Sequence, residues 1–182
     1  SVGSASKASI FGAEGARTLS YKPWRFKISR TFFLSANSHF EAALRGWRET
    51  MKHCRGFDDN VVAVTDWMYM TLRRLGRDAE AAALLVNIKP DMEMIENTAY
   101  YRRQLMYKGL LQPEELLKTE NASELDVATY GYGVGNWHLY NGDRVKAVEV
   151  FERVVAGPYW PAFGYIAAEV DLTRMRDPEA GR

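Results

Sequence analysis

The stretch LYNGDRVKAVEVFERV, from Leu139 to Val154, decides the fold of this chain. Near its start, Asn141-Gly142 separates two apolar segments, and an Asn-Gly pair is the strongest local signal for a two-residue turn between β-strands. The flanking residues, however, repeat their apolar positions at helical spacing rather than in alternation. The pair therefore predicts a turn between two helices, with Asp143 capping the second of them.

The same turn signal recurs along the chain at a fixed interval. Gly76, Gly109 and Gly142 each end a helical pattern, and the two intervals between them are both 33 residues. A helix–turn–helix unit repeated with a period of this size is typical of an α-solenoid. One helix pair cannot bury its own apolar face, whereas stacked pairs share a continuous core. The spacing therefore predicts stacked pairs of helices.

Helical periodicity runs through most of the chain, and no segment alternates as a half-buried strand would. The sequence predicts an all-α fold, a short α-solenoid of stacked helix-turn-helix repeats with a period of about 33 residues. We expect an extended or flexible basic tail over residues 1–23, the repeat domain over 24–176 and a polar end over 177–182. The helices are expected over residues 39–54, 60–76, 77–88, 94–109, 113–119, 126–142, 143–157 and 162–175.

The charge of the chain is unevenly distributed. The net charge is only +1, which is not the pattern of a general nucleic-acid-binding protein. Residues 1–57 carry +7 and residues 58–182 carry −6, however. A basic front and an acidic back favour docking to an acidic surface or contact between copies, although a basic tail on an acidic domain would give the same split. No run of about 18 apolar residues occurs, so we expect no transmembrane helix.

The N-terminal segment is basic, aromatic and poor in acids, which predicts either a docking element or a stretch that packs on the first helices of the chain. Such composition also remains when an organelle transit peptide is removed, which would place the protein in a mitochondrion or plastid. The compartment stays open, with a soluble or peripheral protein expected. The residues proposed to dock on a neighbour are Arg17, Lys22, Trp24, Arg25, Lys27 and Arg30.

The repeat unit resembles the tetratricopeptide repeat family. The best unit, residues 128–161, has a small residue at Gly135, the Gly142-Asp143 turn, and then Ala147 and Phe151 on the second helix. A second unit, which starts at Val62, matches at Gly76, Ala81 and Leu85. The resemblance extends over roughly residues 24–175 and implies a scaffold for other proteins.

The resemblance also implies a binding surface, because the first helix of each unit lines the concave groove in this family. Tyrosine and arginine are also enriched at binding hot spots. Gap-filling between helices is the alternative role for the tyrosines. Carried over by position, the groove residues are Asp66, Met70, Arg73, Arg74, Arg103, Met106, Tyr107, Tyr132, Asn136 and Tyr140.

Candidate chemical motifs are few. The glycines of GYGVGNW, residues 131–137, fall inside a helix pattern without the Lys-Ser/Thr of a phosphate loop, so they predict close approach of helices. The acids Asp91, Glu93 and Glu96 are expected to favour the start of the helix over 94–109. The three histidines lack metal-ligand spacing, and we expect neither a metal nor a cofactor.

The leading hypothesis is a non-enzymatic scaffold or adaptor that binds other proteins, in a narrower version an accessory subunit of a larger organellar or membrane complex. Two other classes stay open. An enzyme could use Cys54 with His53, or the acidic residues. A helical repeat that binds RNA could use Arg73, Arg74, Arg102 and Arg103, although the acidic back half of the chain argues against nucleic acid.

Overall fold

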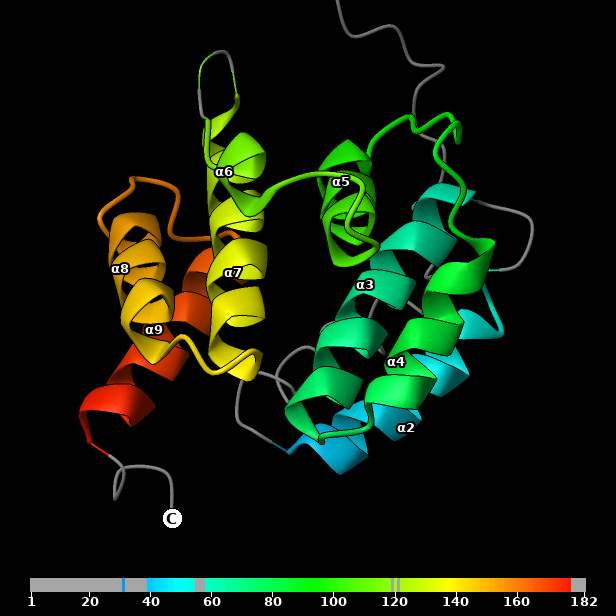
Figure 1. Cartoon of the computed structure of the whole chain (residues 1–182), viewed down its shortest axis with the longest axis horizontal. Coiled ribbons are helices and arrows are strands. Elements are labelled where there is room, and N and C mark those ends of the chain that lie inside the picture. Colours follow the sequence, from blue (N-terminus) through cyan, green and yellow to red (C-terminus); the bar gives the residue numbers. More distant parts are fainter. Residues whose placement is uncertain (1–30, 32–38, 55–57, 119, 121, 178–182) are drawn as a thin grey trace, which may run out of the picture.

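The computed structural model describes residue 31 and residues 39–54, 58–118, 120 and 122–177. Every regular element within these residues is helical, which confirms the all-α prediction (Figure 1). The α-helices are α2 (Phe40–Met51), α3 (Asp58–Arg74), α4 (Asp78–Leu84), α5 (Thr98–Tyr107), α6 (Pro113–Leu116), α7 (Glu124–Tyr140), α8 (Arg144–Val155) and α9 (Phe163–Arg176), with a 3-10 turn, η1 (Leu85–Asn87), after α4.

The helices follow one another in space much as they do in sequence. α3, α5, α7 and α9 each contact the next, while α4 packs on α3, α6 on α5 and α7, and α8 on α7 and α9. α2 packs on α3, so that α2 and α4 lie at one end of the domain and α8 and α9 at the other (Figure 1). The longest helices, α3 and α7, lie between these ends and also contact each other.

The three spaced glycines end their helices in the same way. Gly76, Gly109 and Gly142 have φ angles of 69°, 73° and 90°, in the left-handed region that glycine adopts without strain. After each glycine, the next amide donates to the carbonyl five residues back, as Asp143 does to His138 at 2.9 Å. This is the Schellman pattern of helix termination. The Asn141-Gly142 pair is thus a helix end, and Asp143 caps α8 by accepting from the Lys146 amide at 3.1 Å.

Replacing Gly142 tests this termination. We expect Gly142→Ala to lower the free energy of unfolding by about 1–2 kcal/mol, because a Cβ is strained at this φ angle. Gly142→Asn should lose less, since asparagine tolerates the left-handed region better. Urea denaturation of the two variants measures the difference, and an alanine variant as stable as the wild type would contradict the assigned role.

The glycines of α7 allow three close approaches, as the sequence predicts. A Cβ at Gly131 or Gly135 would overlap Val154 or Phe151 of α8, and a Cβ at Gly133 would overlap the Arg103 side chain of α5. The cost of glycine in a helix, about 1 kcal/mol each, is therefore offset by packing on two sides. α7 is held against both neighbours because its surface is flat at these positions.

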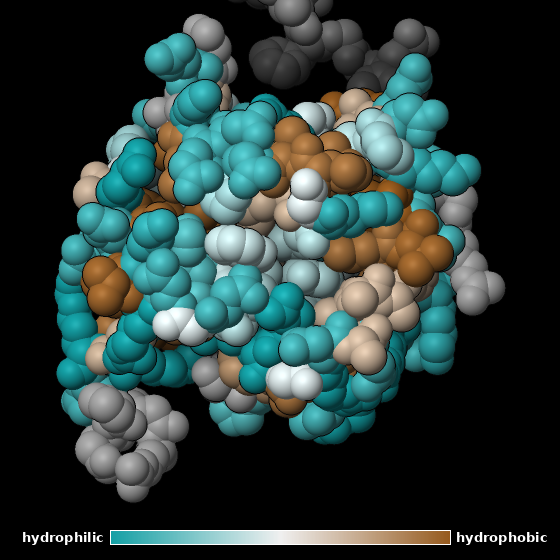
Figure 2. Space-filling model, viewed as in Figure 1, coloured by the Kyte–Doolittle hydropathy of each residue, from teal (hydrophilic) through white to brown (hydrophobic). Residues whose placement is uncertain are grey.

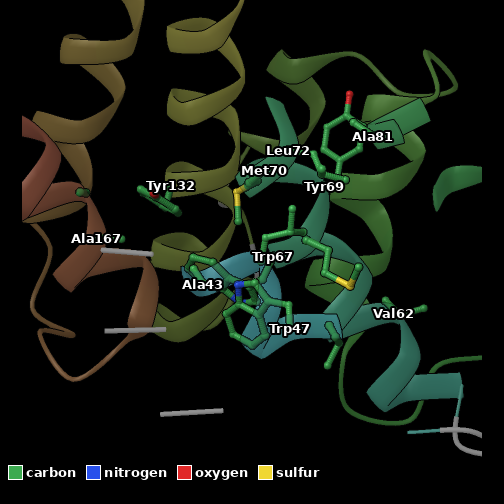
Figure 3. Packing of buried hydrophobic residues seen from close by; sticks show 14 of the residues in the cluster. Ala43, Trp47, Val62, Trp67, Tyr69, Met70, Leu72, Ala81, Tyr132 and Ala167 are labelled. Atoms are coloured by element: carbon green, nitrogen blue, oxygen red, sulfur yellow. The ribbon is translucent and has the colours of Figure 1, made fainter. Parts of the chain in front are cut away.

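A row of aromatic rings crosses the core. Trp47 stacks on Trp67 with ring centroids 6.1 Å apart, Trp67 on Tyr132 at 5.8 Å, and Tyr132 on Phe151 at 5.6 Å. Figure 3 shows Trp47, Trp67 and Tyr132 converging between α2, α3 and α7. Offset aromatic pairs contribute about 0.5–1.5 kcal/mol each beyond their buried area. The row therefore ties α2, α3, α7 and α8 into one core.

The start of α5 differs from the sequence prediction. α5 begins at Thr98 rather than near residue 94, so Asp91, Glu93 and Glu96 lie in the preceding loop and do not occupy a first helical turn. Instead, the carboxylate of Asp59, on α3, caps the backbone amides just before α5. It accepts the backbone amides of residues 95, 96 and 97 at 2.9, 2.8 and 2.7 Å. The capping group comes from another helix, which local sequence does not reveal.

Asp59 should make stability depend on pH in the acid range. Burial acts to raise the pKa of Asp59, but the three backbone hydrogen bonds outweigh it and hold the pKa below its usual value. A lowered pKa contributes stability above the unfolded-state value near 4, and that contribution is lost as the pH falls through the folded pKa. We expect Asp59→Ala to cost about 1–2 kcal/mol at pH 7.

The cost of Asp59→Ala should shrink when unfolding is measured below pH 4, where the wild-type carboxyl is increasingly protonated. Asp91→Ala, an exposed acid in the loop that Asp59 holds, is the matched control and should change little. A cost that stays constant from pH 7 to pH 3 would show that the charge of Asp59 is not what holds the loop.

Candidate functional site

The ten residues that the resemblance assigned to a groove lie on α3, α5 and α7, but most are not open to a partner. Four are partly exposed, namely Arg73, Arg74, Tyr107 and Tyr140. The other six are buried, because the inner faces of α3, α5 and α7 close on one another, and partner binding by this set stays a prediction. The buried side chains are Asp66, Met70, Arg103, Met106, Tyr132 and Asn136.

An ion pair without solvent exposure lies at the centre of these residues. Arg103 Nη2 is 2.7 Å from Asp66 Oδ2, and both side chains are 0% exposed. The guanidinium also donates to the Thr129 carbonyl at 3.1 Å and to the Tyr107 hydroxyl at 3.2 Å. It lies over the ring of Tyr100, with 5.4 Å between Cζ and the ring centroid. Arg103 therefore joins α3, α5 and α7 rather than facing a ligand.

Burial dominates the electrostatics of this pair. Removal from water raises the pKa of Asp66 to about 7, against the opposing charge of Arg103 and the Tyr107 hydroxyl. Burial alone would lower the pKa of Arg103, but Asp66 raises it above its usual value, so the guanidinium stays charged. Each charge thus compensates the other at a site without solvent exposure.

A second group of side chains forms a partly exposed rim next to the pair. Tyr69 stacks on Tyr107 with ring centroids 4.3 Å apart, and the Arg73 guanidinium lies 4.3 Å from the ring centroid of Tyr140. Arg73 also forms a 2.8 Å ion pair with Asp78 and donates to the Asn141 side chain at 2.8 Å. Tyr69 is buried in this group, whereas Arg73, Tyr107 and Tyr140 are each partly exposed.

The Arg74 side chain reaches the far end of the domain. It forms an ion pair with Asp171 of α9, and the Tyr132 hydroxyl donates to the same carboxylate at 3.2 Å. Burial raises the pKa of the Tyr132 hydroxyl, so it remains a donor. Arg74 is thus used within the domain, and the contact links α3 directly to α9.

Two of the predicted groove residues lie apart from these contacts. Met106 belongs to a small separate cluster with Leu116, Val134 and Val150, on the side of α5 that faces α6 and α7. Asn136 is 1% exposed, and its Oδ1 accepts no hydrogen bond within the described part of the chain. The structure therefore brings together eight of the ten residues through direct contacts or shared partners, including Met70, whose sulfur accepts from Arg103 at 2.8 Å. Met106 and Asn136 lie outside these contacts.

The proposed N-terminal docking residues and the tail over residues 1–23 lie outside the described residues, as do residues 178–182. The residues outside the described ranges include Arg17, Lys22, Trp24, Arg25, Lys27 and Arg30.

The residues of the alternative hypotheses are dispersed over the domain. Cys54 is buried, its thiol donates to the Thr50 carbonyl, and burial raises the pKa of the thiol, which disfavours the reactive thiolate. His53 is exposed and lies 3.8 Å from Glu49. Of the arginines considered for RNA, Arg102 lies over the ring of Tyr130 with 5.7 Å between Cζ and the centroid. Among the described residues, no three His, Cys, Asp or Glu side chains are grouped as metal ligands would be.

A cleft between α6 and α8 was not predicted. It has a volume of about 540 Å³ and a neighbouring depression of about 120 Å³ that shares part of its lining. The sequence carries one weak sign of this cleft, because the helical pattern after Pro113 is short. In the structure the helix is shorter still, with four residues. The cleft is lined by Glu114, Leu117, His138, Lys146, Glu149, Val150, Glu152, Arg153 and Ala156.

His138 lies at this cleft and is mostly buried. Burial lowers the pKa of its imidazole, with Asp143 acting in the opposite direction from 3.8 Å. The ring packs edge-on against Trp137, with centroids 5.0 Å apart. The imidazole is therefore neutral near pH 7 and contributes hydrogen-bonding capacity rather than charge to the cleft.

No protein-family model matches the chain, and no curated protein and no solved structure is significantly similar to it. None of the described helices has both the length and the apolar character that crossing a membrane requires.

Proposed function

We propose that the chain is a non-enzymatic scaffold that binds other proteins, built as a short α-solenoid of tetratricopeptide-like helix pairs. The observation that carries the proposal is the triple recurrence of one helix end. Gly76, Gly109 and Gly142 share the positive φ angle and the Schellman hydrogen bonds at intervals of 33 residues. Nothing in local helix chemistry requires equal intervals, whereas a repeated helix pair does.

The order of the helix contacts supports the same proposal. α3, α5, α7 and α9 would be the first helices of successive units, and α4, α6 and α8 the second helices. α2 would be the second helix of a preceding unit. The small residues Gly135 and Ala81, and the large Phe151, lie at helix contacts, as a tetratricopeptide-like unit would place them.

The binding surface of this scaffold would lie outside the closed interior. Asp66 and Arg103 are covered by the domain itself, so partner contact would use the rim formed by Arg73, Tyr107 and Tyr140 and other exposed faces. The face shown in Figure 2 carries several separate hydrophobic patches among hydrophilic side chains. Patches of this kind, rather than one apolar surface, suit a subunit with more than one neighbour.

Purification of the tagged chain from its native source, followed by cross-linking and size-exclusion chromatography, tests the scaffold function. We expect a complex of fixed stoichiometry with at least one other protein, including the accessory-subunit case of an organellar or membrane complex. Arg73→Glu, at the rim, should weaken that association, while Lys89→Glu in the exposed α4–α5 loop serves as control. A chain that stays monomeric and alone at micromolar concentration would refute the proposal.

A further inference from the structure

The row formed by α4, α6 and α8 is incomplete in its middle. α4 has seven residues and continues into the three-residue turn η1, and α8 has 12 residues, but α6 has only four. At about 1.5 Å per residue, α8 is about 18 Å long and α6 only about 6 Å. Figure 1 shows α6 beside one end of α7, with the chain leaving it at once. Among the residues that the structure describes, no neighbouring helix therefore covers a large part of the flank of α8, and the 540 Å³ cleft lies there.

The floor of the cleft is apolar. Leu117 and Val150 line both the cleft and the adjoining depression, which adds Leu116, Val127 and Val154. The depression reaches α7 at Gly131, where the missing side chain lets α8 come close. Apolar side chains of a ligand could thus be buried against two walls at once, from α6 and from α8.

The α8 side of the cleft's rim carries charges in a fixed order, and Glu114 adds a negative charge on the α6 side. Lys146, Glu149 and Arg153 follow one another at helical spacing on the same flank of α8, with Val150 between them. Neighbours at such spacings commonly pair. Within the described part of the chain, however, no ion pair joins Glu149 to Lys146 or Arg153. The positive–negative–positive order along α8 is thus available to a partner.

We propose that this cleft binds an amphipathic α-helix of a partner protein, which takes the position that further turns of α6 would occupy. The partner helix presents apolar side chains to Leu117 and Val150. It carries acidic residues opposite Lys146 and Arg153 and a basic residue between them, opposite Glu149. This inference rests on the proposed scaffold function, and it names a surface on the second helices and the chemistry of the partner.

A pair of synthetic peptides tests the proposal directly. Both have 14 residues and the same leucine and alanine stripe, one with the rim order Glu-Lys-Glu and the other Lys-Glu-Lys. Fluorescence anisotropy with the wild-type chain should show the Glu-Lys-Glu peptide binding about tenfold more tightly, because its rim complements that of α8. Nuclear magnetic resonance shifts should concentrate at residues 146–156 and at Leu117.

A charge-reversed variant supplies the matched comparison. Lys146→Glu with Glu149→Lys and Arg153→Glu changes only exposed side chains, so it should remain folded by circular dichroism, and its preference between the two peptides should be reversed. Lys89→Glu, a distant exposed charge, should leave the wild-type preference unchanged. A Glu-Lys-Glu peptide with a central proline should lose binding, since it cannot form the helix.

The results that overturn the inference are distinct from those that overturn the scaffold function. Equal binding of both peptides, an unchanged preference in the charge-reversed variant, full binding of the proline peptide, or shifts confined to other residues would each refute the helix-binding cleft. If the charge-reversed variant still forms its native complex at the wild-type stoichiometry, the cleft is refuted while the scaffold stands. If the wild-type chain forms no complex, the scaffold function itself fails.

Discussion

Arg103→Ala should be among the most destabilising single substitutions in this protein, with a loss of about 3–5 kcal/mol in the free energy of unfolding. The substitution leaves the Asp66 carboxyl, 0% accessible in the wild type, buried without its counter-ion. The pKa of Asp66, already about 7 beside Arg103, would rise further, so the group must bind a proton or stay charged at high cost. It also removes the donor to the Thr129 carbonyl of α7 and the contacts with Tyr100. A domain of this size is stable by about 5–15 kcal/mol, so the loss is a large share of the total. Urea denaturation followed by circular dichroism measures it.

The double variant Asp66→Leu with Arg103→Met is the matched control. It removes both charges and keeps much of the volume, so it should recover most of the loss seen in Arg103→Ala. The difference between this double variant and Arg103→Met alone, which has the same side chain at position 103, measures the cost of the unpaired carboxylate without a difference in cavity volume at that position. If Arg103→Ala cost less than about 1 kcal/mol, water would have to reach Asp66, and the closed interior described above would be wrong.

Gly133→Ala should destabilise the same site from the opposite side, by about 2–3 kcal/mol. The added Cβ would overlap the middle of the Arg103 side chain, whose guanidinium is fixed by Asp66 and Thr129. The gain in helix propensity, about 1 kcal/mol for Ala over Gly, offsets only part of that cost. The melting temperature and the denaturation midpoint should both fall.

Combining the two substitutions gives the sharpest measurement. In the Arg103→Ala background the overlap is absent, so Gly133→Ala should become neutral or stabilising through helix propensity alone. The resulting double-mutant cycle should show a coupling of about 2–3 kcal/mol between the positions, large for two residues on different helices. Additive losses would mean that Gly133 is needed for another reason.

Local chemistry made much of the fold predictable from the sequence. Helical periodicity identified the helices, because each buries one face. The glycine at each helix end has a positive φ angle that other residues adopt with strain. Gly142 therefore indicates a helix end, although the Asn141-Gly142 pair alone is typical of a β-turn. Likewise, the glycines of α7 could be interpreted as contact points, since glycine persists in a helix chiefly where a neighbour approaches closely.

The parts that were missed depend on contacts between distant residues. The start of α5 is set by Asp59, which local sequence around residue 94 cannot indicate. The resemblance to a repeat family predicted that Asp66 and Arg103 lie on the inner surfaces of their helices. It could not predict that these surfaces close on each other. The cleft beside α6 exists because α6 has only four residues. The short helical pattern after Pro113 indicates this only weakly.

The Arg74–Asp171 ion pair has a consequence for how the protein unfolds. It joins residues 97 positions apart in sequence, from α3 to α9, and α3 also contacts α7 directly. In an extended array each unit touches only its neighbours, so the ends can melt independently. Here Arg74 of α3 and the Tyr132 hydroxyl of α7 both contact the Asp171 carboxylate of α9, so α9 cannot detach without disturbing the centre of the domain. We therefore expect α9 to lose its amide protection from hydrogen exchange together with α3, in one cooperative transition, rather than to fray from the end of the chain.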